Sequence, residues 1–222
     1  MQGTFLSFSD AEIRKAIMGP TRKKAASPHG FPVELFRELP SLLGPVHDLR
    51  NGIITSGHFP VPLLRLYLII LDKPNRGAGF CKNKRPIFLL RVPAEILEMA
   101  AYHRFLPLFK DELEHRQYEY GRSRRTELHQ LELWGFVREA RASGQFVSIA
   151  VVEVGSAFDA VSHGRLMQTL DSWGMGTYRA RYVHTRLTSR FFQVHLDTPG
   201  GRFLSGLPQG GVLSPPFAAF SF

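Results

Sequence analysis

The hydrophobic and polar positions near the start of the chain predict a capped helix. Ser9 is followed three residues later by Glu12, which is the pattern of a capping box, and Phe8 is placed to pack against Ile13. The Gly-Pro pair at 19–20 cannot continue a helix. We therefore expect a first helix that starts at Ser9 and ends at this pair.

Farther along the chain, helical and strand-like patterns follow each other without strict alternation. We expect helices over 31–39, 93–110, 126–142, 165–173 and 178–187, and strands over 65–71, 191–196 and 202–204. The last two strands flank the turn-forming stretch 197–201, which predicts a hairpin. Helices mixed with a few strands predict the α+β class.

The segment 146–154 (FVSIAVVEV) is almost wholly apolar and β-branched. This composition is typical of a strand buried on both faces. We therefore expect a central strand here, with Glu153 near its end.

The charge of the chain favours an anionic partner. Its 222 residues contain 28 Lys and Arg against 19 Asp and Glu, a formal net charge of +9. Nucleic acid is the first candidate and an acidic membrane surface the second, while a protein that is simply basic stays open. The single cysteine excludes a disulfide framework, and we see neither a signal peptide nor a membrane span. We expect a soluble, intracellular protein.

Two stretches carry the candidate chemistry. Glu153 and Asp159 could both supply oxygen ligands to Mg²⁺, although a strand-end charge and a helix cap would explain them equally simply. The stretch 206–215 (GLPQGGVLSP) combines prolines and adjacent glycines with a glutamine. Such a loop can approach a ligand closely while an amide side chain hydrogen-bonds it.

Several fragments together resemble the reverse transcriptases of non-LTR retrotransposons, of the jockey/ingi or LINE type. VVEVGSAFDAVSH resembles their motif A and GLPQGGVLSP their motif B, and FSDAEIRKAI, LIILDKP, KNKRPIFLL and HRQYEYGRSRRTELHQL resemble further motifs in the family's order. The resemblance implies the fingers and a partial palm of a right-hand polymerase. It implies a fingers-like region over 1–145, with part of the palm interleaved, and a partial palm over 146–222.

The resemblance also implies roles for individual residues around an incoming deoxynucleotide. Arg85 matches the fingers arginine that holds the triphosphate, and Lys73 stands on the neighbouring loop, where a solvated lysine is an equal alternative. Phe158 matches the aromatic residue that crowds the sugar 2′ position, although core packing would explain it equally well. Gln209 and Gly210 match the loop that lies against nucleotide and template.

An RNA template or an RNA–DNA hybrid is the partner that the resemblance implies, in the nucleus or the cytoplasm. We expect weak, sequence-independent binding through basic residues, with strong salt dependence. These residues are Lys23, Lys24, Lys73, Lys82, Lys84 and Arg85. We also expect Arg85, Phe158, Gln209 and Glu153 to converge on one groove.

Two departures from the family predict that the chain as it stands does not polymerise DNA. Glu153 occupies the motif A position of an aspartate, and no Tyr-x-Asp-Asp motif follows motif B before Phe222. Mg²⁺, expected for the family, should therefore not be bound productively. The sequence thus favours a truncated and degenerate reverse-transcriptase fragment. A repurposed nucleic-acid-binding protein without catalysis, a fragment with no independent role, and a basic scaffold outside the family are the alternatives.

Overall fold

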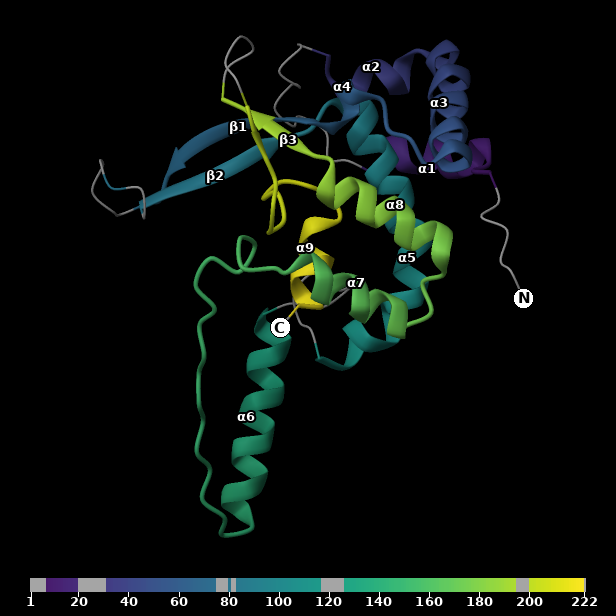
Figure 1. Cartoon of the computed structure of the whole chain (residues 1–222). Coiled ribbons are helices and arrows are strands. Elements are labelled where there is room, and N and C mark those ends of the chain that lie inside the picture. The colour runs from purple at the N-terminus through teal and green to yellow at the C-terminus, as the bar shows by residue number, and fades with distance from the viewer. Residues whose placement is uncertain are drawn as a thin grey trace.

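The computed structural model describes residues 7–19, 31–74, 80, 83–116, 126–194 and 200–221. Figure 1 shows a small sheet and a group of helices packed around a long central helix, α5, with α6 projecting from this body. The helices are α1 (Asp10–Met18), α2 (Val33–Glu38), η1 (Pro40–Leu42), α3 (Leu43–Ser56), α4 (Val61–Leu64), α5 (Val92–Arg116), α6 (Thr126–Ala142), α7 (His163–Ser172), α8 (Thr177–Thr188) and α9 (Ser214–Ala219). The strands are β1 (Arg65–Asp72), β2 (Lys84–Leu89), β3 (Phe191–Gln193) and β4 (Gly201–Arg202).

The four described strands form one sheet in the order β2-β1-β3-β4. β1 and β2 form an antiparallel hairpin in which Tyr67 lies opposite Leu89 and Asp72 opposite Lys84. β3 pairs with β1 in parallel and with β4 antiparallel. The mixed helical and strand content agrees with the α+β class that the sequence predicts.

Helix α5 is the common element of the core. Its residues Ile96, Leu97 and Phe105 are almost fully buried, and each belongs to a different hydrophobic cluster. One cluster joins α5 to α1 and α3, a second joins it to the sheet, and the third joins it to α7, α8 and α9. The helix is therefore the support on which the rest of the body packs.

The predicted start of the first helix is confirmed. The Ser9 side chain accepts a hydrogen bond from the backbone N–H of Glu12, and the Glu12 carboxylate accepts one from the backbone N–H of Ser9. Phe8 and Ile13 are both buried in the same cluster, as the predicted contact requires. The helix ends at Met18 with Gly19 as its C-cap.

Most other predicted elements are present with shifted ends. The helix over 126–142 is confirmed at both ends, and α5 runs six residues beyond the predicted end at Lys110. The hairpin of β3 and β4 is confirmed with shorter strands, while its tip at 195–199 lies outside the described residues.

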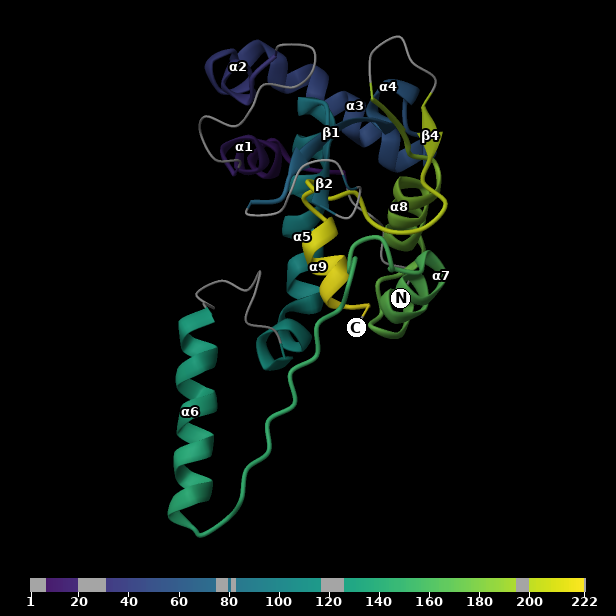
Figure 2. The same ribbon diagram turned by 90° about the vertical axis from the view of Figure 1, so that its left-hand side faces the viewer.

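The predicted central strand over 146–154 is wrong. This segment forms no strand or helix, and the side chains of Phe146, Val151 and Val152 are 104%, 90% and 84% exposed. Figures 1 and 2 show it returning beside α6, from the far end of that helix back to the body. A β-branched apolar sequence favours strand geometry, but a strand also needs a neighbour to pair with. In the described part of the chain, β1 is flanked by β2 and β3 instead.

Among the described residues, no helix is both long enough and apolar enough to cross a bilayer.

The capping glutamate predicts a specific pH dependence of stability. Glu12 accepts hydrogen bonds from Arg104 Nε at 2.7 Å and Nη2 at 2.9 Å, and chiefly these bonds lower the pKa of Glu12 from 4.5 to about 2. The ionised carboxylate therefore stabilises the fold above pH 4.5, and this contribution is lost as the pH falls towards 2. Glu12→Gln should lower the free energy of unfolding at pH 7 by about 1 kcal/mol, because the side chain is 36% exposed and partly screened.

Urea unfolding of the wild type and Glu12→Gln at pH 7, 4 and 3 tests this expectation. The difference between the two proteins should shrink with falling pH. Glu38→Gln is the control, since Glu38 is exposed in the neighbouring α2. A difference that stays constant down to pH 3 would contradict the assignment.

Candidate functional site

The glutamine-containing loop at 206–213, which we name the Gln209 loop, is fastened to the sheet at β2. The backbone N–H of Phe88 donates a hydrogen bond to the carbonyl oxygen of Gln209 at 2.7 Å. Gly210 has φ +111°, and a Cβ atom there would lie 2.7 Å from the carbonyl oxygen of Phe88. Because only glycine adopts this conformation and allows this approach, Gly210 lets the loop lie directly against the strand.

The start of the Gln209 loop is held by the turn that precedes α7. Leu207 N–H donates to the carbonyl oxygen of Phe158 at 2.8 Å, and Gly206 N–H donates to that of Val161 at 2.9 Å. His163 Nε2 donates to the carbonyl oxygen of Gly206 at 2.7 Å. The resembled motif A and motif B segments are therefore in direct backbone contact through residues 158–161.

A buried carboxylate fixes the other end of the Gln209 loop. Glu98 on α5 is 0% exposed, and its Oε2 accepts a hydrogen bond from the backbone N–H of Val212 at 2.9 Å. Its Oε1 accepts hydrogen bonds from Arg186 Nη2, at 2.5 Å, and from Arg190 Nη2. One side chain thus connects α5, α8, the start of β3 and the Gln209 loop.

The sequence reasoning missed this cluster, although a signal was present. Glu98 lies one helical turn after Ala94, one turn before Ala101 and two turns before Phe105, so its position belongs to the buried face of α5. Burial lowers the pKa of Arg190 to about 9, which is still above neutral pH. The arginine therefore stays charged beside the carboxylate. A glutamate in the apolar phase of a helix indicates a buried ion pair of this kind.

Arg85 shares β2 with the attachment point of the loop. Its side chain is exposed, and the guanidinium has no hydrogen-bond or ion-pair partner among the described residues. Side chains two apart on a strand point to the same face, so Arg85 lies on the face of Ile87. A Cβ atom at Gly210 would lie 3.6 Å from the Ile87 side chain. The structure therefore brings Arg85 and the Gln209 loop to one part of the sheet.

Phe158 and Gln209 differ in what their side chains do. Phe158 is partly buried and packs against the cluster of α5, α7, α8 and α9, which agrees with the core-packing alternative. Gln209 is half-buried, and its amide side chain has no hydrogen-bond partner in the described part of the chain. That amide is available to a ligand.

The predicted basic residues are only partly described. Lys84 is paired with Asp72 across the β1–β2 hairpin, so its charge is locally compensated. Lys73 follows β1, and its backbone N–H donates to the carbonyl oxygen of Asn83 at 2.8 Å. Lys23, Lys24 and Lys82 lie outside the described residues.

The side chain of Glu153 has no hydrogen bond or ion pair that links it to the other predicted site residues. It lies in the exposed segment beside α6 and makes no hydrogen bond or ion pair with any described residue. No group of three His, Cys, Asp or Glu side chains that could hold a metal occurs within the described ranges. Backbone hydrogen bonds connect Phe158, the Gln209 loop and β2, and the convergence of Glu153 on the same groove stays a prediction.

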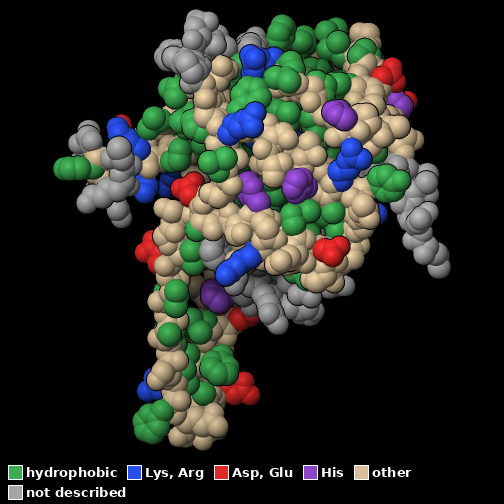
Figure 3. All heavy atoms as spheres, in the orientation of Figure 1, with side chains coloured by type: hydrophobic (Ala, Val, Ile, Leu, Met, Phe, Trp, Pro, Cys, Tyr) green, Lys and Arg blue, Asp and Glu red, His purple; other side chains and the backbone are tan. Residues whose placement is uncertain are grey.

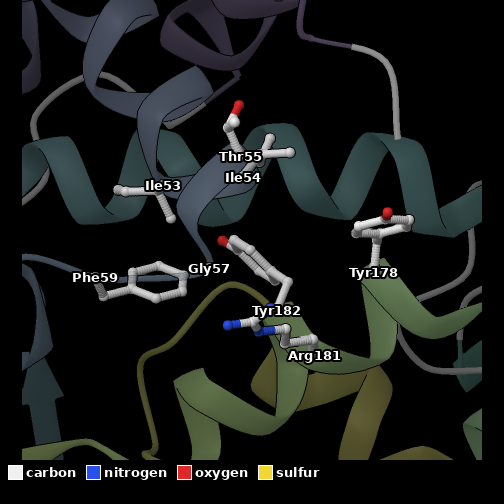
Figure 4. Close-up of a pocket in the computed structure, with 8 residues that line it drawn as sticks. All are labelled: Ile53, Ile54, Thr55, Gly57, Phe59, Tyr178, Arg181 and Tyr182. Atoms are coloured by element: carbon white, nitrogen blue, oxygen red, sulfur yellow. The ribbon is translucent and has the colours of Figure 1, made fainter. Parts of the chain in front are cut away.

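A separate hollow lies between the end of α3 and the first turns of α8 (Figure 4). Tyr182 and Phe59 form its aromatic wall, with ring centroids 5.2 Å apart, and Arg181 lies against Gly57. Burial raises the pKa of Tyr182, so its hydroxyl stays neutral. The enclosed space of about 20 Å³ admits water rather than a nucleotide. This hollow belongs to helix packing and not to the candidate site.

Comparison with known proteins links the chain to a transposon protein. No model of a known protein family matches the chain. A relative from Xenopus laevis, named "Transposon TX1 uncharacterized 149 kDa protein", is 26% identical over 208 residues. The match covers 91% of this chain and 16% of the relative, so the chain spans a small part of that protein's length.

The close approach at Gly210 yields a test of the loop attachment. Gly210→Ala should detach the loop from β2 and cost roughly 1–3 kcal/mol, because alanine is strained at this φ and its methyl group meets a backbone oxygen. Hydrogen exchange of the Phe88 amide reports the bond to Gln209 directly and should accelerate. Gly52→Ala on α3 is the matched control, since nothing lies within 4 Å of its Cβ position. Unchanged protection at Phe88 would refute the assigned role of Gly210.

Proposed function

We propose that this chain is a reverse-transcriptase-like segment of non-LTR retrotransposon origin that binds an RNA–DNA hybrid or RNA on the face formed by β2 and the Gln209 loop. The observation that carries the proposal is the attachment of the Gln209 loop to the strand that bears Arg85. The similarity to a transposon protein supports the origin. In a longer parent protein, the corresponding activity would be RNA-templated DNA synthesis.

The chemistry of this face suits a phosphate backbone. Arg85 presents an exposed guanidinium without a described partner, and a planar guanidinium binds phosphate oxygens through two parallel hydrogen bonds. The free amide of Gln209 adds a donor and an acceptor beside it. The formal net charge of +9 favours approach of a polyanion.

We propose that the 222-residue chain binds without catalysing polymerisation. Two-metal phosphoryl transfer needs carboxylates that hold ions roughly 3.5–4 Å apart. Glu153 lies in the exposed segment, and among the described residues no group of three or more His, Cys, Asp or Glu side chains could hold a metal ion. Binding on β2 depends on none of these acids, so the two properties are separable.

Removal of the free guanidinium should weaken binding in a salt-dependent manner. Arg85→Gln should raise the Kd for a short RNA–DNA hybrid by roughly tenfold at low salt and reduce the slope of log K against log salt by about one. Fluorescence anisotropy over a series of salt concentrations measures both quantities. Arg14 is an exposed arginine on α1, so Arg14→Gln is the control. This variant should change the Kd and the salt slope less than Arg85→Gln does. An unchanged slope for Arg85→Gln would place the binding face elsewhere.

The purified chain should not extend a primer. With an RNA template, a DNA primer, deoxynucleotides and Mg²⁺ or Mn²⁺, we expect no product above background, because the carboxylates that would hold two ions are not assembled. Denaturing gel electrophoresis of a labelled primer is the measurement. Template-dependent extension that is abolished in Glu153→Ala would overturn the non-catalytic assignment while leaving the binding face in place.

A further inference from the structure

Exposed apolar side chains are concentrated on one part of the molecule. Helix α6 and the segment 145–155, which we name the arm, project together from the body (Figures 1 and 2). The space-filling view shows apolar side chains along it (Figure 3). Nine of the twenty exposed large hydrophobic side chains among the described residues lie on the arm: Leu128, Leu131, Trp134, Phe136, Phe146, Ile149, Val151, Val152 and Val154.

This concentration indicates an interaction surface. Contiguous apolar patches of this kind on a folded protein mark interfaces. The segment 146–152 is also extended without a strand partner among the described residues, so its backbone groups are available to pair with another strand. A partner that supplies a strand could pair with the extended segment, and a partner that supplies an apolar helix face could cover α6. One partner that supplies both would cover the whole arm.

The charges of α6 match those of a second, antiparallel copy of the same helix. Glu127 lies in the first turn and Arg141 in the last turn. A two-fold axis level with Trp134 places Glu127 of each copy opposite Arg141 of the other, and both residues lie two helical turns from Trp134 on the same face of α6. A parallel arrangement of the two helices would instead place like charges opposite each other.

The extended segment fits the same two-fold axis. Residues 145–152 (QFVSIAVV) carry no charge, so antiparallel pairing of two copies opposes no like charges. The 17 residues of α6 span about 25 Å at ~1.5 Å per residue, and about eight extended residues cover the same length at ~3.3 Å each. Ile149 is therefore level with Trp134 along the arm, and one axis relates both residues to their own copies.

We infer that the arm is a homodimerisation element, in which two copies pair their 146–152 segments as antiparallel strands centred on Ile149 and pack their α6 helices antiparallel. Trp134 and Phe146 supply up to roughly 300–500 Å² per copy, at ~150–250 Å² each. Two copies thus supply roughly 600–1,000 Å² from these aromatic side chains, and the exposed aliphatic side chains of the arm bring the buried area towards the ~1,200–2,000 Å² of specific interfaces. This inference is independent of the proposed nucleic-acid function.

Sedimentation velocity over a range of protein concentrations tests the dimer. The wild type should sediment as a monomer–dimer equilibrium, and Trp134→Glu and Val151→Lys should each remain monomeric where the wild type is dimeric. Both side chains are exposed in the single copy, so circular dichroism and Tm should show folded variants. Leu204→Lys is the control, because Leu204 is 87% exposed outside the arm and its variant should still dimerise.

Cysteine cross-linking tests the register. In a Cys81→Ser background, which removes the chain's single cysteine, Ile149→Cys should form an intermolecular disulfide on mild oxidation. Residues directly opposed on antiparallel strands lie ~4.5–5.5 Å apart between Cα atoms, within the range for a disulfide. Phe146→Cys alone should not cross-link, but it should do so when mixed with Val152→Cys.

Each result decides the inference. Loss of the dimer in both arm variants, with cross-links at 149 and between 146 and 152, supports it. A wild type that is monomeric at all concentrations, aggregates of no fixed size, or a dimer that survives Trp134→Glu and Val151→Lys would overturn it. Efficient cross-linking of Phe146→Cys to itself would overturn the proposed register.

Discussion

The candidate site depends on one buried carboxylate more than on any other side chain. Glu98 accepts hydrogen bonds from two arginines and from the backbone of the Gln209 loop. Removing one partner of a buried ion pair typically costs ~3–5 kcal/mol, because the remaining charge stays in a low-dielectric interior. Arg186 also donates to the carbonyl oxygen of Leu63, so the same cluster fixes α4 and the start of β1. The position of the loop relative to β2 is therefore set from inside the protein, through α5.

The sequence predicts the elements whose signals are local. The capping box at Ser9 and Glu12, and the bounds of α6, need only residues within a few positions of each other. The glycine-rich stretch also indicates close backbone approach, and Gly210 shows it against Phe88. What the stretch cannot specify is the element approached, because that depends on a contact more than a hundred residues away in the chain.

The predictions that failed are those that depend on non-local partners. The apolar sequence of 146–154 indicates a buried strand, but burial requires a neighbouring element, and no described strand pairs with it. The expected position of Glu153 near the end of that strand followed from the same assumption and failed with it. Glu98 was missed for the opposite reason, since its burial depends on Arg186 and Arg190, which lie far along the chain.

The Gln209 loop and the arm differ in how firmly the rest of the protein holds them. Hydrogen bonds to β2, to Glu98 and to the turn at 158–161 hold the Gln209 loop. Its conformation is therefore set within the chain, without a binding partner. Glu153 lies on the arm, and its surroundings are set by whatever covers the arm. In an antiparallel pairing centred on Ile149, Glu153 lies opposite Gln145 of the other copy, a neutral neighbour that leaves the carboxylate without a second acid. The proposed phosphate binding at β2 uses Arg85 and Gln209, and it therefore does not depend on the carboxylate chemistry that the motif A resemblance implies.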